Sequence, residues 1–345
     1  MGGTVEVKNA FQRALAGEPQ RVPPIWLMRQ AGRYHRPYQE LRKHHGFEEL
    51  CRVPELAAEV AMGPIRDFDF DAAILFSDLL FPLEALGMSL SYEDGPPKLD
   101  GPLDRDRIAR FRSAEEAATR LQFQADAVAL TRRRLSPDKG MIGFVGGPWT
   151  LFVYAMEGSH AGAMRIAKSS WLLYREFAER MVPVLRTCIA QQLEAGADVV
   201  MMLDTAAGEL PPSFFHREMV PDLTSLAETF AGRLGYYAKA AHPAHFGGAM
   251  ATARWAGIGV DSRWDLASLL AGPRHGFVQG NFDPAWLFLP ERDLESALRG
   301  FVEPIAALAE HQRRGWICGL GHGVLPGTPE SAVRAFVTAV RKAFA

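Results

Sequence analysis

Residues 23–34 read PPIWLMRQAGRY, a short apolar run that ends in two arginines, Arg29 and Arg33. The run predicts a buried strand whose end carries both guanidinium groups into the cavity that this edge of the sheet lines. A guanidinium is a planar, permanently charged fork of donors that matches a carboxylate or a phosphate. Two of them, separated by the conformationally free Gly32, predict an anion site. A solvated basic turn is the alternative.

Seven further short runs repeat this apolar, unalternating pattern along the chain. Runs of this kind are typical of strands that are buried on both faces of a parallel sheet. Several of them end in a polar side chain, as the first one does. They cover residues 71–78, 141–148, 198–205, 235–240, 257–262, 276–283 and 316–322.

Helical segments separate these runs, and the alternation decides the fold class. Eight strands with intervening helices predict a (β/α)8 TIM-type barrel that spans residues 1–345 as a single domain. A doubly wound sheet is the alternative, but the chain has neither a G-x-G-x-x-G turn nor a P-loop to support it. The turn-rich stretch 93–102 follows a short predicted strand at 89–92 and is expected to be an excursion of the second βα loop. The expected helices cover 8–16, 38–50, 54–66, 114–135, 170–195, 213–234, 294–314 and 329–344, with shorter helical connections near 244–255 and 264–270.

The composition is that of a globular protein with a sizeable core, since 48% of the 345 residues are hydrophobic and 23% are charged. A formal net charge of −2 argues against a nucleic-acid-binding protein, which usually has a strongly basic domain. Cys51, Cys188 and Cys318 are too few and too scattered for a disulfide framework. The sequence has no apolar run of membrane-spanning length and no N-terminal targeting pattern. We therefore expect a cytoplasmic protein without a nucleic-acid or membrane partner.

The active site of such a barrel lies at the carboxyl ends of the strands, so the residues that close each strand are the candidates. Asp78 follows an apolar run, and its desolvated carboxylate needs a cation or N–H donors, which the arginine pair or a ligand would supply. His322 is surrounded by three glycines, which would let the backbone approach a ligand closely. The other candidates are Arg29, Arg33, the loop 146–154, Asp204 with Thr205, Lys239, Asp261, and Asn281 with Asp283.

Structural roles compete with chemistry at several of these positions. Asp204, Asp261 and Asp283 could instead cap the helices that follow them, which is the commoner role for an acid at a strand-to-helix turn. Lys239 could simply pair with one of these acids.

A zinc site is a further alternative, because His242 and His245 follow a strand and Cys318 lies on another. No local spacing ties the cysteine to the two histidines. We therefore predict that the chain holds no metal.

Five stretches of the chain together resemble the uroporphyrinogen decarboxylase family. They occur in the family's order and span nearly the whole chain, and MRQAGRY is highly specific to this family, whereas the glycine-rich stretches alone are weak. The stretches are MRQAGRY (28–34), AAILFSD (72–78), GFVGGPWTLFVYAMEG (143–158), QGNFDP (279–284) and GLGHGVLPGTP (319–329).

The resemblance implies a cofactor-free homodimer of (β/α)8 barrels in tetrapyrrole biosynthesis. Such an enzyme removes CO2 from the four acetate side chains of uroporphyrinogen and gives coproporphyrinogen. The resemblance assigns catalysis to Asp78 and Arg29, and it places Asp78 against the pyrrole N–H groups. Thr205 stands where a serine is expected, and Ser262 stands where a tryptophan is frequent. The substrate contacts carried over by motif are Arg29, Gln30, Ala31, Gly32, Arg33, Asp78, Tyr154, Thr205 and His322.

This implied reaction agrees with the residues found. Loss of CO2 from a pyrrolic acetate needs an electron-deficient ring, most simply a ring protonated on carbon, and a carboxylate held against the N–H groups stabilises that cation. The proton donor stays open: Arg29 is a family candidate but a poor acid, and a bound water or a substrate carboxyl are alternatives. A related barrel that transfers methyl groups with zinc or cobalamin and a non-catalytic tetrapyrrole-binding protein are the alternative functions.

Overall fold

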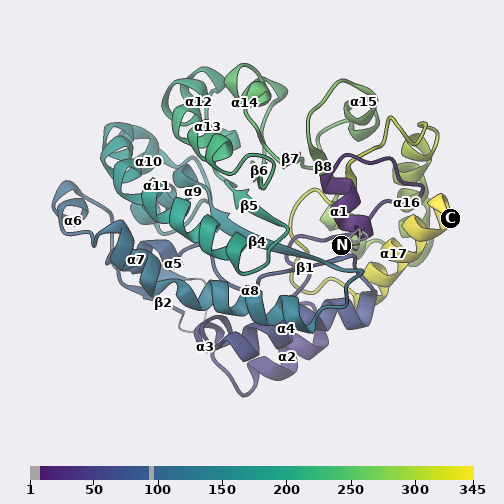
Figure 1. The fold of residues 1–345 in the computed structure, drawn as a ribbon, viewed down its shortest axis with the longest axis horizontal. Coiled ribbons are helices and arrows are strands. Elements are labelled where there is room, and N and C mark those ends of the chain that lie inside the picture. Colours follow the sequence, from purple (N-terminus) through teal and green to yellow (C-terminus); the bar gives the residue numbers. More distant parts are fainter. Residues whose placement is uncertain (1–7, 93–96) are drawn as a thin grey trace, which may run out of the picture.

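In the computed structural model, which describes residues 8–92 and 97–345, seven parallel strands form one curved sheet with helices around it (Figure 1). Each strand pairs with the next one along the chain, in the order β1-β4-β5-β6-β7-β8-β9. The strands are β1 (Ala72–Ile74), β4 (Gly140–Gly146), β5 (Val199–Leu203), β6 (Leu234–Tyr237), β7 (Gly257–Gly259), β8 (Phe277–Phe282) and β9 (Trp316–Leu320).

The helices surround the sheet, with α4 beside α8 on one side and α16 beside α17 on another (Figure 1). The first half of the chain forms α1 (Ala10–Leu15), α2 (Arg36–Arg42), α3 (Phe47–Arg52), α4 (Pro54–Phe68), α5 (Phe81–Leu86), α6 (Arg105–Ala109), α7 (Ala114–Arg120), α8 (Gln122–Arg134), α9 (Pro148–Glu157), α10 (Arg165–Ser169) and α11 (Trp171–Glu194). The second half forms η1 (Ala207–Glu209), α12 (Pro212–Glu218), α13 (Val220–Thr229), η2 (Pro243–Phe246), α14 (Ala249–Thr252), α15 (Leu266–Ala271), η3 (Pro284–Phe288), α16 (Glu291–Ala306) and α17 (Glu330–Phe344).

The predicted helices are found, but three of them are divided. The segment 38–50 forms α2 and α3, separated where Gly46 caps α3 with an extended backbone. The segment 114–135 breaks at Leu121 into α7 and α8. The segment 213–234 forms α12 and α13 and ends where β6 begins. Among the described residues, no helix is long and apolar enough to cross a membrane.

A short antiparallel pair extends the loop after β1. β2 (Leu90–Ser91) pairs with β3 (Lys98–Leu99), which confirms the strand predicted at 89–92. The turn-rich stretch 93–102 begins in residues 93–96, which lie outside the described part of the chain, as do residues 1–7. The pair belongs to the βα loop between β1 and β4, as the sequence predicts.

The eighth predicted strand, at the start of the chain, is reduced to a single bridging residue, Ile25. The Cys318 N–H donates to the Pro24 carbonyl (2.8 Å), and the Trp26 N–H donates to the Cys318 carbonyl (3.0 Å). Pro23 and Pro24 have no N–H groups with which to lengthen this ladder. The predicted strand is therefore correct in its place beside β9 and wrong in its length.

Side chains complete the closure on the other edge of this segment, toward β1. The Asp71 N–H donates to the Ile25 carbonyl (2.9 Å), and the Ile25 N–H donates to Oδ2 of Asp71 (2.6 Å). Gln30 donates from Nε2 to the Ala72 carbonyl (2.9 Å), and Arg341 of α17 donates to the same Asp71 oxygen (2.6 Å). These contacts join the first segment to β1, so the sheet closes into the predicted α/β barrel.

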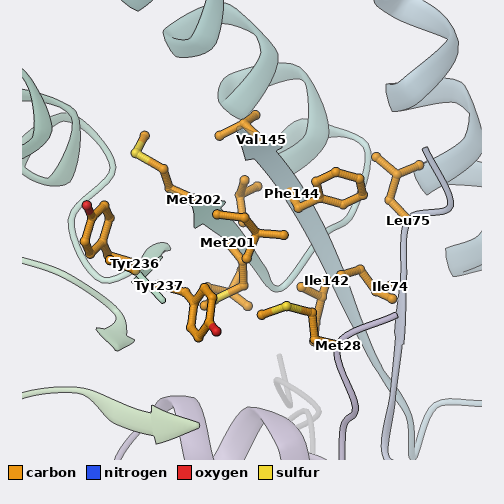
Figure 2. Close-up of a cluster of buried hydrophobic side chains, with 14 of the residues drawn as sticks. Met28, Ile74, Leu75, Ile142, Phe144, Val145, Met201, Met202, Tyr236 and Tyr237 are labelled. Atoms are coloured by element: carbon orange, nitrogen blue, oxygen red, sulfur yellow. The ribbon is translucent and has the colours of Figure 1, made fainter. Parts of the chain in front are cut away.

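Large side chains fill the interior of the barrel. Figure 2 shows Met28, Ile142, Met201 and Tyr237 gathered between the strands, and all four are buried. Successive side chains of a strand point to opposite faces, so Tyr236 points away from this group. The first segment therefore contributes to the core through Met28 as well as to the closure of the sheet.

Helix α1 closes the amino-terminal end of the barrel. Its Phe11 is buried against Gly140, the first residue of β4. A Cβ at position 140 would lie 2.2 Å from the Phe11 ring, so only glycine leaves room for it. At the opposite end of the barrel, the strands end in the loops that connect them to the following helices.

We expect Asp71→Asn to lower the free energy of unfolding by about 1 to 3 kcal/mol, because the amide keeps an acceptor but loses the charge that Ile25 and Arg341 share. Denaturant unfolding followed by circular dichroism measures this. Asp69→Asn is the matched control, since Asp69 is exposed and its left-handed backbone (φ 53°) suits asparagine. Its change should stay within about 0.5 kcal/mol. Equal losses in the two variants would contradict the role assigned to Asp71.

Candidate active site

The ends of the strands bring five of the predicted residues to one rim of the barrel. All strands of a parallel barrel end at the same edge, which is why residues far apart in the sequence meet there. Arg29 follows the Ile25 bridge, Asp78 follows β1, Tyr154 lies on α9 after β4, Thr205 follows β5, and His322 follows β9.

Arg29 has a backbone conformation that few residues with side chains adopt. Its φ of 59° lies in the left-handed region, and the carbonyl before it, that of Met28, accepts from the Val324 N–H (2.9 Å). Its side chain passes over Gly323, where a Cβ would come within 2.4 Å of Arg29 Cδ. Among the described residues, no carboxylate forms an ion pair with this guanidinium. Its charge is therefore available to an anionic ligand.

The three glycines around His322 make room for other parts of the protein. A Cβ at Gly319 or Gly321 would lie 2.3 or 2.4 Å from a backbone atom of another segment, and Gly323 accommodates the side chain of Arg29. These glycines therefore have a packing role within the protein. That they also let the backbone approach a ligand stays a prediction.

Asp78 is half-buried where β1 ends, and its Oδ1 accepts a hydrogen bond from the Leu80 N–H (2.8 Å). Burial raises the pKa of this carboxyl, whereas the Leu80 N–H, the Tyr92 hydroxyl and the Arg29 guanidinium act in the opposite direction. Because burial prevails, the protein by itself compensates the negative charge incompletely. Further N–H donors or a positive charge placed against Asp78 would stabilise it.

Tyr154 joins this region through a partner on the next loop. Its hydroxyl lies 2.7 Å from Nδ1 of His160. Burial raises the pKa of Tyr154, the charge of Asp78 adds to this effect, and Arg29 opposes it. Burial lowers the pKa of His160, and the charges of Lys239 and Arg29 lower it further. These mutual effects place the five groups in one electrostatic environment.

His322 is also within the electrostatic reach of Arg29. Its Nδ1 is 3.0 Å from the hydroxyl of Tyr237, and the two rings are nearly parallel, with an angle of 13° between their planes. Burial lowers the pKa of His322 to about 3, with the positive charges of Arg29 and Lys239 acting in the same direction. The imidazole is therefore neutral at physiological pH.

Two residues at this rim, His160 and Tyr237, were not singled out from the sequence. His160 lies in a short glycine-containing loop, and Tyr237 lies within an apolar run, so no local pattern distinguishes either of them. Lys239 was a strand-end candidate, and its exposed side chain acts on both histidines.

The remaining residues of the arginine motif differ in their surroundings. Gln30 is fully buried, and its side chain is bound to the backbone, with Oε1 accepting from the Leu27 N–H (3.3 Å) as Nε2 donates to β1. Arg33 is exposed, and the ionisable group it affects is Tyr38. Ala31 and Gly32 are half-buried. The structure thus groups Arg29 with the rim residues, and contacts of all five with a substrate stay predictions.

Asp204 anchors helix α9, which precedes it in the sequence. Its Oδ1 accepts from the N–H (2.9 Å) and the hydroxyl (2.7 Å) of Thr150, and its Oδ2 accepts from the Tyr236 hydroxyl (3.1 Å). It thereby caps the helix that carries Tyr154, so the alternative that it caps the following helix is wrong. Thr205 is buried beside it, and its hydroxyl has no hydrogen-bond partner among the described residues.

The other strand-end acids have structural partners. Asp261 forms an ion pair with Arg263; burial would raise its pKa, but this pair and backbone N–H groups hold the pKa below its usual value. Asn281 donates to two carbonyls within 261–264 (2.8 and 2.9 Å). Asp283 caps η3, which confirms the structural alternative for that residue. Asp261 instead contacts Arg263 in its own loop.

The described residues contain no group of three or more histidine, cysteine or acidic side chains that could hold a metal ion. Nε2 of His245 lies 2.9 Å from the Leu210 carbonyl, and Cys318 is buried within β9. The three residues of the alternative zinc site are therefore not brought together.

A cleft of about 690 Å³ lies away from this rim group, between α15 and α16. Its wall includes Trp264, Trp286 and Phe301, and it contains none of the positively charged rim residues. We place the candidate active site at the rim, because the cations and the incompletely compensated carboxylate are found there.

Comparisons with known proteins identify the family of this chain. The family model described as Uroporphyrinogen decarboxylase (URO-D) matches residues 7–343. Uroporphyrinogen decarboxylase of Chloroflexus aggregans is 36% identical over 354 aligned residues, which cover 97% of this chain and 96% of that protein. The human uroporphyrinogen decarboxylase is 34% identical over 359 aligned residues, which cover 99% of this chain and 95% of that protein.

Solved structures show how widely the fold is used. A methyltransferase from Methanosarcina mazei superposes with a TM-score of 0.75 at 19% identity, covering 98% of this chain and 100% of that one. A B12-independent methionine synthase from Shewanella sp. W3-18-1 gives a TM-score of 0.56 at 12% identity, covering 88% and 89%. Identities this low establish the fold alone. The family model and the full-length relatives establish more, and the chain belongs to the uroporphyrinogen decarboxylase family.

Proposed function

We propose that this chain removes CO2 from the four acetate side chains of uroporphyrinogen, converting them to methyl groups and giving coproporphyrinogen in tetrapyrrole biosynthesis. The observation that carries the proposal is the position of Asp78 at the end of β1, where its Oδ1 accepts from the Leu80 N–H, on the same rim as an Arg29 that has no ion-pair partner among the described residues. Relatives named for this activity align with nearly the full length of the chain. We propose further that the enzyme is a cytoplasmic homodimer whose residues 1–345 form one barrel domain.

The positive groups at the rim suit a substrate with many carboxylates. Arg29 presents a two-pronged donor without an ion-pair partner among the described residues, and Lys239 adds an exposed ammonium group. Arg33 supplies a second exposed guanidinium a few residues further on. In a protein whose net charge is −2, these cations form a local attraction for a polyanion. The further contacts we assign to the substrate are Gln30, Ala31, Gly32, Tyr154, Thr205 and His322.

The reaction replaces a carboxylate by a proton at each acetate. Protonation of a pyrrole ring carbon creates an electron-deficient ring, and the pair of electrons from the breaking carbon–carbon bond flows into that ring as CO2 leaves. A proton then adds to the exocyclic carbon to form the methyl group, and the ring loses the proton gained first. The substrate is its own electron sink, so the chemistry needs no cofactor.

Asp78 is assigned to the cationic intermediate. Its carboxylate accepts hydrogen bonds from the pyrrole N–H groups, and its negative charge faces the positive charge that develops in the ring. Burial already raises the pKa of Asp78, which means that its anionic form gains from a new positive neighbour. Arg29 acts by binding and orienting a carboxylate; because a guanidinium is a very weak acid, a bound water or a substrate carboxyl is better suited to donate the proton.

Dialysis against a strong chelator should leave turnover of uroporphyrinogen unchanged. The proposed reaction uses side chains and the substrate alone, whereas the alternative methyl transfer depends on zinc or cobalamin. An anaerobic assay of carboxyl loss before and after dialysis makes the comparison. Activity that disappears and returns on addition of zinc would favour the methyltransferase alternative.

Asp78→Asn should lower kcat by about 10² to 10³, because the amide carries no charge to stabilise the protonated pyrrole. Its NH2 group would also direct donors at groups that are donors themselves. The melting temperature should stay close to that of the wild type, since asparagine is similar in size and retains an oxygen for the Leu80 N–H. Both quantities are measured on the same preparation.

Asp283→Asn is the control for this substitution. Asp283 also follows a strand of the barrel, but it caps η3 and has no place in the proposed reaction. Its replacement should cost up to about 1 kcal/mol of stability and leave turnover per folded molecule nearly normal. If the Asp78 variant behaves in the same way, with kcat within about threefold of the wild type, the mechanism is wrong.

A further inference from the structure

Tyr237 is the last residue of β6 and points toward the buried group that includes Met28 and Met201, whereas Tyr236 points away from it (Figure 2). Its hydroxyl lies 2.8 Å from the carbonyl oxygen of Gly321 and 3.0 Å from Nδ1 of His322. The side chain is fully buried, so neither contact is replaced by bulk water. One hydroxyl therefore connects β6 to two consecutive residues after β9.

The protons in these two contacts can be assigned from the chemistry of the groups. A carbonyl oxygen can only accept, and a tyrosine hydroxyl has one proton to donate. The contact with Gly321 therefore uses the proton of Tyr237, which leaves the tyrosine oxygen as an acceptor. The 3.0 Å contact with His322 is then a hydrogen bond only if Nδ1 of the imidazole carries a proton.

The charges around His322 determine whether its other nitrogen is protonated as well. Burial and the positive charges of Arg29 and Lys239 favour the neutral ring, and the carboxylate of Asp261 opposes them with less effect. A neutral ring protonated at Nδ1 has a lone pair at Nε2. This nitrogen has no hydrogen-bond partner among the described residues, and it is not among the fully buried atoms that lack one.

We propose that Tyr237 is a positioning residue for His322. The Tyr237 hydroxyl holds the imidazole of His322 in the Nδ1–H form, so that Nε2 meets the substrate as a hydrogen-bond acceptor. The group that Nε2 receives is an N–H or O–H donor, such as a pyrrole N–H or an un-ionised acetic acid group. An ionised carboxylate is unfavourable there, because two lone pairs would face each other. The identity of the substrate rests on the proposed function, whereas the tautomer does not.

The division of labour at the rim follows from this assignment. Arg29 and Lys239 attract the ionised carboxylates, and His322 with Asp78 provides acceptors for the donors of the tetrapyrrole. A histidine that interconverted between the two tautomers would offer a donor at Nε2 for part of the time and would compete for the carboxylates. Tyr237 thus determines whether Nε2 of His322 is a hydrogen-bond donor or an acceptor, without contacting the substrate itself.

Nitrogen NMR of the histidine rings tests the tautomer without any substrate. The protein is labelled with ¹⁵N-histidine at pH 7, and the signals of His322 are identified by their loss in His322→Asn. We expect a protonated Nδ1 and an unprotonated Nε2 in the wild type. In Tyr237→Phe the ring stays but the acceptor for Nδ1–H is gone, so the His322 signals should shift toward the Nε2–H form. With uroporphyrinogen, kcat/KM should fall about two- to tenfold.

Tyr174→Phe is the matched control, because Tyr174 is equally buried and its hydroxyl has no hydrogen-bond partner among the described residues. It should change neither the His322 signals nor kcat/KM. A wild-type His322 protonated at Nε2 overturns the proposal whether or not the Tyr237 variant folds. Unchanged signals in a folded Tyr237→Phe also overturn it. Expected signals in a protein that does not decarboxylate uroporphyrinogen support the tautomer and refute the proposed function instead.

Discussion

The barrel depends on how its first segment joins β9 to β1. Ile25 bridges to Cys318 on one side, and on the other it exchanges hydrogen bonds with Asp71, whose carboxylate stands in for a backbone carbonyl. Without this segment the sheet would have two open edges, each with unsatisfied N–H and C=O groups. The same short segment then leads directly to Arg29, so the closure of the barrel and the position of the main cation at its rim are set together.

The rim concentrates charge that the protein does not neutralise. Arg29 acts on the titration of Asp78, Tyr154 and His322, yet no carboxylate among the described residues pairs with it. Elsewhere, acids at strand ends are engaged, as with Asp261 and its partner Arg263. Unpaired cations and the half-buried carboxylate of Asp78 lower the stability of the folded protein, and a ligand of complementary charge would restore that stability. This asymmetry is the physical basis for locating chemistry at the rim.

Positioning of the rim residues comes from contacts behind them. Asp204 holds the amino-terminal turn of α9 through Thr150, and α9 carries Tyr154 to the rim. A Cβ at Gly147 would lie 2.1 Å from the Asp204 carboxyl carbon, so glycine is needed at this approach. Tyr237 holds His322 in the same way, through the contact of its hydroxyl with Nδ1. Tyr154 and His322, which we expect to face a ligand, are thus oriented by buried polar groups that lie behind them.

Much of this protein is determined locally and could be predicted from the sequence. Buried parallel strands have short apolar runs, helices begin and end at characteristic residues, and the alternation of the two defines a barrel whose strand ends carry the functional residues. Arg29, Asp78, Tyr154 and His322 were placed at one rim on these grounds. The break between α2 and α3 at Gly46 and the shortening of the first strand after Pro23 and Pro24 have local causes that the strand and helix predictions passed over, whereas the break at Leu121 is not marked by a glycine or a proline.

Only the tertiary structure decided which side chains act on one another. Tyr237 and His322 are 85 residues apart, and Thr150 and Asp204 are 54 apart, so no spacing in the sequence connects them. For the same reason the sequence could not indicate that Asp204 caps the helix before it, or that the glycines near His322 make room for other segments of the protein. Hydrogen bonds and charge effects act over a few ångströms, and the distances that matter are fixed by the closed barrel, which exists only once all of its strands are in place.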